Sequence, residues 1–153
     1  MTAETSAAIP GSAERGLLDT NVMILRHRID ASELPDEVAI SAVTLAELAA
    51  GVHLVDESAP DAAAERARRT DVLQRAESDF DPFPFDAAAA RMFGRVSAAV
   101  RSIGRTPRRR STDLMIASVA AANQLPLYTT NPDDFAGLDD LVDVVALTPV
   151  PPS

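Results

Sequence analysis

The sequence contains no cysteine and no lysine, and each absence removes a set of functions. Without cysteine the chain cannot form a disulfide and offers no thiolate to a metal. Only two histidines are present, His27 and His53, and they do not have the spacing of a zinc-binding pair. A metal site in this chain would therefore be built mainly from oxygen ligands, which favours Mg²⁺ or Mn²⁺.

The missing residues also exclude several enzyme classes that use acidic pockets. Phosphoaspartyl signalling domains and P-loop proteins both need a lysine beside the phosphoryl group, and this chain has none. The glycine pattern of a dinucleotide fold is absent too. Phosphatases with an aspartate nucleophile use Asp-x-Asp, whereas Asn21 stands in the second place here. Neither histidine has the surroundings of a Ser-His-acid triad.

Length and composition are those of one globular domain. The chain has 153 residues, of which 46% are hydrophobic and 24% charged. Its net charge of −9 argues against non-specific binding to nucleic acid. No apolar run is long enough to span a membrane, and residues 1–15 lack the features of a signal peptide. We therefore expect no membrane association and a cytoplasmic location.

Hydrophobic patterning predicts an α/β fold. We expect a flexible leader over 1–14, one domain over 15–148 and a tail over 149–153. Apolar, β-branched segments predict strands that alternate with helices, which implies a central parallel sheet of four to five strands flanked by helices. The predicted strands are 15–19, 37–43, 125–130 and 141–147, and the predicted helices are 22–28, 44–56, 58–79, 86–104 and 112–124.

Acidic residues recur where predicted strands pass into helices. Asp19 closes the first strand, Glu47 lies in the first turn of the helix after the second, and Asp113 opens a buried helix. Asp133 and Asp134 follow the strand that ends at 130. Binding sites of open parallel sheets form at the carboxyl ends of the strands, so these side chains can meet at one edge.

Each acid also has a purely structural interpretation. Thr44 and Glu47 have the spacing of a capping box, and the sequence "TNPDD" has the order of a capped helix start. Acids in a first helical turn complement the amide dipoles there. Several carboxylates in one place would repel one another, however, unless a cation lay between them. Mg²⁺ or Mn²⁺ would relieve that repulsion and activate a water molecule.

Four segments, spanning Gly16 to Leu147, resemble the PIN-domain ribonucleases, specifically the VapC-like toxins of toxin–antitoxin pairs. The segments occur in the family's order, and they are "LLDTNVMI", "ISAVTLAELAAG", "STDLMIASVAAANQLPLYTTNPDDF" and "VDVVAL". The resemblance implies a single PIN-like domain and a Mg²⁺-dependent endoribonuclease, with Mn²⁺ as the alternative metal. It implies an RNA substrate, inhibition of translation and growth, and a VapB-like antitoxin as partner.

The family's motifs also imply site residues. The metal-binding and catalytic set would be Asp19, Glu47, Asp113 and Asp134. Asp134 matches the family pattern best as the fourth member, although Asp133 and Asn131 remain alternatives. Supporting polar groups would be Thr20, Asn21, Thr112 and Asn131.

A basic band separates Asp86 from Asp113, because this interval contains arginines and no acid. On a helix, the first four of these arginines would fall within an arc of roughly 120°. They are a solvated face in one interpretation and a strip that binds RNA phosphates or the antitoxin in the other. The arginines are Arg91, Arg95, Arg101, Arg105, Arg108, Arg109 and Arg110.

Two further expectations concern assembly and activity. The helices 44–56 and 60–78 have more alanine and leucine than one small core needs, and we predict a homodimer, which is also the family's usual state. The alternative to an active enzyme is a catalytically silent PIN module that serves as an RNA- or protein-binding scaffold. The intact set of acids favours the active enzyme.

Overall fold

The computed structural model describes residues 14–151, so residues 1–13 of the predicted leader and 152–153 of the predicted tail lie outside the described residues. The strands are β1 (Arg15–Leu18), β2 (Glu37–Ala39), β3 (Leu127–Thr129) and β4 (Val144–Ala146). The α-helices are α1 (Thr20–Leu25), α2 (Ala42–Val52), α3 (Ala62–Asp79), α4 (Ala87–Ser102) and α5 (Ser111–Ala122). The short 3-10 helices are η2 (Arg26–Arg28), η3 (Ala31–Glu33), η4 (Pro107–Arg110) and η5 (Pro132–Phe135).

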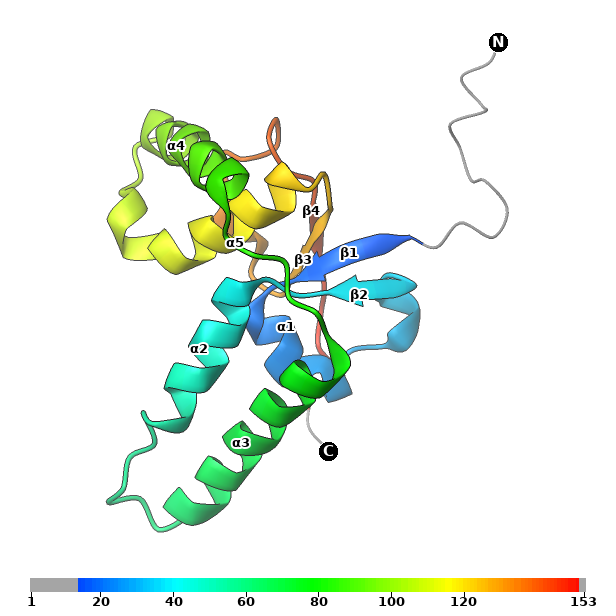
Figure 1. Cartoon of the computed structure of the whole chain (residues 1–153), viewed down its shortest axis with the longest axis vertical. Helices are drawn as coiled ribbons and strands as arrows, with labels where there is room; N and C mark the ends of the chain where they lie inside the picture. The colour runs from blue at the N-terminus through cyan, green and yellow to red at the C-terminus, as the bar shows by residue number, and fades with distance from the viewer. Residues whose placement is uncertain (1–13, 152–153) are drawn as a thin grey trace.

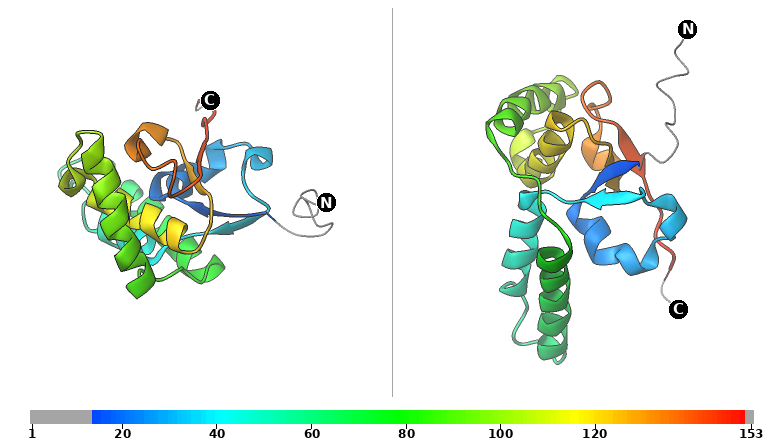
Figure 2. Two further views of the ribbon diagram at one scale, coloured as in Figure 1. Left: turned by 90° about the horizontal axis from the view of Figure 1, so that it is seen from above. Right: turned by 45° about the vertical axis from the view of Figure 1, so that its right-hand side comes forward.

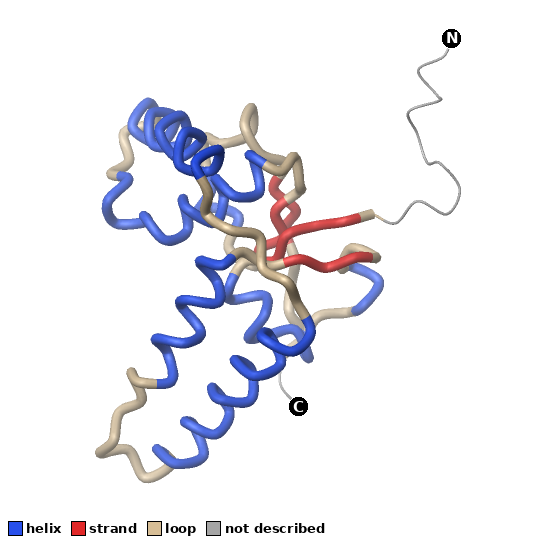
Figure 3. Tube along the Cα trace, viewed as in Figure 1, coloured by secondary structure: helices blue, strands red, loops and turns tan. Residues whose placement is uncertain are grey.

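The strands of the described residues form one parallel sheet in the order β2-β1-β3-β4, drawn in red in Figure 3. Leu17 of β1 is in register with Ala39 of β2 on one side and with Leu127 of β3 on the other. The chain therefore leaves β1 toward one edge of the sheet and later returns to its other side. This reversal places a crevice at the carboxyl ends of β1 and β3. The α/β class and the four-stranded parallel sheet confirm the prediction from the sequence.

Alternating side chains of β1 enter two separate cores. Leu17 packs with α4 and α5 on one face of the sheet, and Leu18 packs with α1, α2 and α3 on the other. Figures 1 and 2 show the resulting three layers, with the sheet between the two groups of helices. Successive residues of a strand point to opposite faces, which explains why strands that are buried on both sides are apolar throughout.

Helices α2 and α3 form a hairpin that extends from the sheet (Figure 2). α3 begins at Ala62, four residues after the predicted start, and its buried residues are Ala62 and Ala76. Much of its remaining surface is charged, with ion pairs such as Arg75 to Asp71. The prediction that 60–78 is an apolar helix with a surplus for a dimer interface is therefore wrong, because its alanines are interspersed with arginines and acids.

The start of α2 also differs from the prediction. Ser41 is the N-cap, and its hydroxyl accepts the backbone N–H of Thr44 at 3.0 Å. Thr44 is thus already inside the helix, and Glu47 lies in the second turn rather than in the first. The capping box of Thr44 and Glu47 does not form, so the carboxylate of Glu47 has no capping role.

No helix between residues 14 and 151 combines the length and the apolar character needed to cross a membrane.

Candidate active site

Asp19 lies at the crevice between β1 and β3. Its backbone N–H donates to the carbonyl of Tyr128 at 3.1 Å, and its side chain caps α1 by accepting the N–H of Val22 at 2.9 Å. The residue is only 6% exposed. Burial raises the pKa of Asp19, and the nearby Glu47 and Asp134 raise it further, against the hydrogen bonds from Thr129 and Val22. A buried carboxylate with acidic neighbours is the kind of group that a cation stabilises.

Glu47 points from α2 toward the same place. The hydroxyl of Thr20, the first residue of α1, donates to Oε1 of Glu47 and lies 3.1 Å from Oγ1 of Thr44. Two helices that begin at neighbouring strands therefore hold this carboxylate between them. The lone acid of the apolar segment 40–51 belongs to the crevice and not to its own helix start.

Asp113 approaches from the first turn of α5, on the other face of the sheet. Its pKa is raised to about 6, mainly by burial and then by the charges of Asp134, Glu47 and Asp19, while Arg110 lowers it. Asp19 and Asp113 therefore each lie within electrostatic range of Glu47 and Asp134, so carboxylates from four different segments approach the same place.

The fourth acid of this group is Asp134 rather than Asp133. Asp134 raises the pKa of both Asp19 and Asp113. Asp133 is 84% exposed and faces away, toward Arg105. Asn131 is also exposed, and its side-chain amide donates to Oγ1 of Thr130 at 3.5 Å. The turn of η5 thus directs Asp133 toward Arg105 and Asp134 toward Arg110, and the role of Asp134 as the fourth site residue stays a prediction.

The group of Asp19, Glu47, Asp113 and Asp134 suits a hydrated divalent cation. Among residues 14–151, no three acidic or histidine side chains lie close enough, as they stand, to bind one ion directly. Mg²⁺ keeps several of its waters and binds proteins through one or two carboxylates, so water can fill the remaining positions. The oxygen donors and the unfavourable charge of the group therefore fit such an ion.

The predicted supporting residues occupy different positions. Thr20 bonds Glu47, as described, whereas Asn21 is exposed and donates to Oγ1 of Thr130 at 3.3 Å. Thr112 is half-buried beside Asp113 in the first turn of α5. The structure thus brings Thr20 into contact with the acids and places Asn21 at the rim.

The basic band is divided in the structure. Arg91, Arg95 and Arg101 are exposed on α4, but α4 ends at Ser102, so Arg105 is not part of that helix face. Gly104, with φ of +82°, turns the chain so that Arg105 reaches Asp133. Arg108 and Arg109 are exposed on η4, and Arg110 pairs with Asp134. The prediction of one stripe of four arginines on a helix is therefore wrong.

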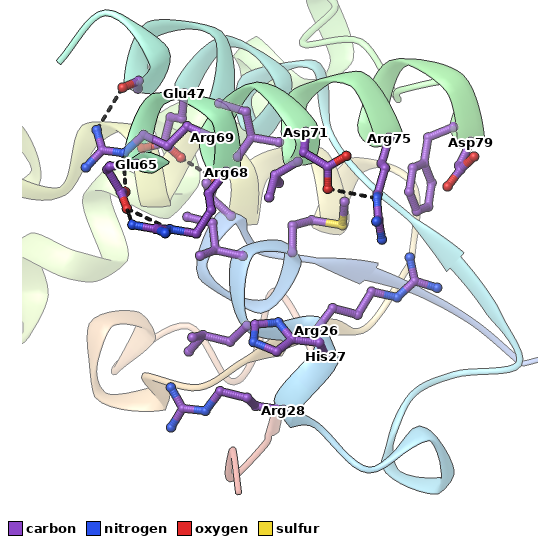
Figure 4. A pocket seen from close by; sticks show the side chains of 18 residues that line it. Arg26, His27, Arg28, Glu47, Glu65, Arg68, Arg69, Asp71, Arg75 and Asp79 are labelled. Carbon is purple, nitrogen blue, oxygen red and sulfur yellow. Dashed lines mark hydrogen bonds and ion pairs between the residues drawn. The ribbon is translucent and has the colours of Figure 1, made fainter. Parts of the chain in front are cut away.

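Sequence reasoning missed a groove of about 1010 Å³ that begins at Thr20 and Glu47 and runs between α1 and the α2–α3 hairpin. Apolar side chains of both walls line it, among them Ile24 and Val72. Figure 4 shows Arg26, His27 and Arg28 on one side and the charged residues of α3 on the other. These residues are distant in sequence, and no motif of the sequence pointed to them.

A parallel α/β sheet with acidic side chains at its switch point has the features of a metal-dependent enzyme, since ligands of open sheets bind there and divalent metals bind carboxylates. A family model for the PIN domain matches residues 16–141. Ribonuclease VapC5 of Mycobacterium tuberculosis is 40% identical over 132 residues, which cover 84% of this chain and 91% of that protein. Ribonuclease VapC8 of the same species is 35% identical over 111 residues, or 72% and 94% of the two chains.

Structural comparison agrees with these matches. The crystal structure of VapBC-5 from M. tuberculosis, a member of the VapBC family of toxin–antitoxin systems, matches with a TM-score of 0.71 and 39% identity. The match covers 86% of this chain and 98% of that one. The chain belongs to the PIN domain family, as the resemblance of its motifs predicted. Ribonucleases of this family generally depend on a divalent metal.

The raised pKa of Asp113 predicts how stability depends on pH. The pKa rises from 3.8 to about 6 on folding, so folding takes up a proton between these values and stability falls as pH increases through this window. Solvent screens the charge of this half-buried group, so the stabilisation is smaller than the full shift implies. Asp113→Asn should therefore raise the free energy of unfolding at pH 7, without metal, by about 1 kcal/mol, or the melting temperature by about 2–4 °C. At pH 4 the gain should vanish.

Thermal unfolding in a chelating buffer at both pH values measures this effect. Asp139→Asn removes an exposed acid and serves as the control, with no gain expected at either pH. A lower melting temperature for Asp113→Asn at pH 7 would show that the charge of Asp113 stabilises the metal-free fold.

Proposed function

We propose that this protein is a VapC-type endoribonuclease and the toxin of a toxin–antitoxin pair. The observation that carries the proposal is the convergence of Asp19, Glu47, Asp113 and Asp134 at the switch point of the sheet. The relatives named ribonuclease VapC5 and VapC8 support the activity, and the VapBC-5 structure supports the pairing with an antitoxin. RNA is present in the cytoplasm, where we expect the protein to act.

In this proposal Asp19, Glu47, Asp113 and Asp134 hold Mg²⁺, with Mn²⁺ as the alternative. The cation would acidify a water molecule and offset the charge that develops on the phosphate during hydrolysis. The role of the protein is to hold the acidic side chains in position before the cation binds. The N–H of Val22 orients Asp19, and the hydroxyl of Thr20 orients Glu47.

The reaction is hydrolysis of an RNA phosphodiester. The oxygen of water forms a bond to phosphorus, the bond from phosphorus to one ribose oxygen breaks, and that oxygen receives a proton. Because water is the nucleophile, the products lack the 2′,3′-cyclic phosphate that attack by the ribose 2′-hydroxyl would leave. Arg91, Arg95 and Arg101, exposed on α4, are the groups we expect to contact RNA phosphates despite the net charge of −9.

The antitoxin is expected to occupy the groove between α1 and the α2–α3 hairpin. This groove combines apolar walls with charged rims, as a peptide with one apolar face requires. Because it begins at Thr20 and Glu47, a segment bound along it would end beside the acids and block access to them.

Expression in a bacterial host tests the toxin role. Induction of the chain should stop growth and reduce protein synthesis, because RNA needed for translation is cut. Co-expression of the small reading frame adjacent to its gene should restore growth. Normal growth with abundant, folded protein would favour the silent scaffold instead.

We also propose a homodimer, although α3 does not supply the apolar face that suggested it. Ile103, at the end of α4, is exposed and is a candidate contact. Light scattering at micromolar concentration should give twice the mass of one 16.2 kDa chain. The mass of a single chain would reject the prediction.

A further inference from the structure

Arg110 lies among the acids of the candidate site. It is the last residue of η4, three positions before Asp113, and its Nη1 is 2.5 Å from Oδ1 of Asp134. The two side chains are 31% and 36% exposed, so the pair is only partly open to water. Arg110 also lowers the pKa of Asp113. One guanidinium group thus acts on acids from two different elements, α5 and η5.

A second arginine–aspartate pair lies close by and serves as a comparison. Arg105 contacts Asp133, the residue next to Asp134, with Nη2 3.2 Å from Oδ2. Asp133 is 84% exposed. Burial is the main cause of the raised pKa of Asp19 and of Asp113, and Asp134, but not Asp133, is among the charges that raise both further. These two neighbouring pairs have the same chemistry, but of the two only the pair of Arg110 and Asp134 belongs to the acidic group.

We propose that Arg110 is a counter-ion that pairs with Asp134 in the metal-free protein and releases Asp134 when a divalent cation binds. The inference rests on the proposed metal site. A single positive charge offsets part of the repulsion among the four carboxylates, and a divalent ion offsets more. Because both cations need the same carboxylate, they compete for it. Arg110 consequently stabilises the empty site and lowers its affinity for metal.

Calorimetric titration with Mn²⁺, without RNA, tests this competition in the full chain. Arg110→Gln should bind Mn²⁺ about 3- to 10-fold more tightly than the wild type, because removing a nearby positive charge favours the incoming cation. Its metal-free form should melt at a lower temperature than the wild type, because the acids lose their counter-ion. An arginine with a merely structural role would instead weaken metal binding when replaced.

Two matched variants complete the experiment. Arg105→Gln removes the same charge from the neighbouring pair and should leave the Mn²⁺ affinity within about twofold of the wild type. Arg110→Lys keeps the charge and should also stay within about twofold, and this variant still tests the proposal if Arg110→Gln does not fold. Tightening in Arg110→Lys, or unchanged or weaker affinity in Arg110→Gln, would overturn the inference. Absence of Mn²⁺ binding by the wild type would instead reject the proposed metal site.

Discussion

Asp19→Asn, Glu47→Gln and Asp113→Asn are each expected to lower the rate of RNA cleavage by roughly 10²–10³-fold, the usual cost of removing one group from an electrostatic site. Each change deletes one negative charge from the acidic group and leaves the shape of the side chain nearly intact. The affinity for Mg²⁺ or Mn²⁺ should fall with it. Cleavage of a defined RNA under single-turnover conditions measures the effect.

Asp133→Asn is the matched control for these variants. Asp133 is adjacent to Asp134 but faces solvent and Arg105, so its replacement should leave cleavage near the wild-type rate. Cleavage at the wild-type rate by the Glu47→Gln variant would show that Glu47 is not part of the site. Loss of cleavage in Asp133→Asn, with normal cleavage in Asp134→Asn, would exchange the roles of these two acids.

Ile24→Asp should release the protein from its antitoxin while leaving RNA cleavage intact. Ile24 is 44% exposed on α1 and lines the groove, so its apolar surface is available to a partner. Replacing isoleucine by a charged residue removes the apolar side chain that the antitoxin would bury. Burial of an isoleucine side chain contributes about 1.5–3 kcal/mol to the binding free energy, so the affinity should fall by roughly 10- to 100-fold. Binding of the protein from the adjacent reading frame measures the change.

Leu54→Asp is the control, because Leu54 is 74% exposed near the end of the α2–α3 hairpin and does not line the groove. It should bind the antitoxin as tightly as the wild type. Equal weakening by both variants would indicate a general loss of stability. Undiminished binding by Ile24→Asp would place the antitoxin elsewhere, with the exposed arginines of α4 as the next candidate surface.

The alternation of strands and helices was sufficient to predict the sheet and the meeting of Asp19 and Asp113. The position of Asp19 follows from the rule that the carboxyl ends of parallel strands share one edge. Asp113 follows η4 rather than a strand, and it reaches this edge because α5 begins there and leads into β3. The start of α2 was not predictable in the same way, since Ser41 and Thr44 are both good N-caps. Only the observed extent of β2, which ends at Ala39, decides that Ser41 caps the helix.

Contacts between distant segments could not be predicted from the sequence. The pairs of Arg105 with Asp133 and of Arg110 with Asp134 join residues 28 and 24 positions apart, and the turn at Gly104 determines which arginine meets which acid. The groove depends on how the α2–α3 hairpin is oriented against α1. Hydrophobic periodicity indicates that a helix has a buried face, but it does not identify the segment against which that face packs.

Cleavage of RNA by the purified, full-length chain in the presence and absence of a divalent metal tests the central claim most directly. We expect cuts in the presence of Mg²⁺ or Mn²⁺, none after addition of a chelator, and recovery when the metal is restored in excess. The products should lack a 2′,3′-cyclic phosphate. Cleavage at the same rate in the chelator, or products that end in a cyclic phosphate, would contradict a site in which the four carboxylates act through a metal ion.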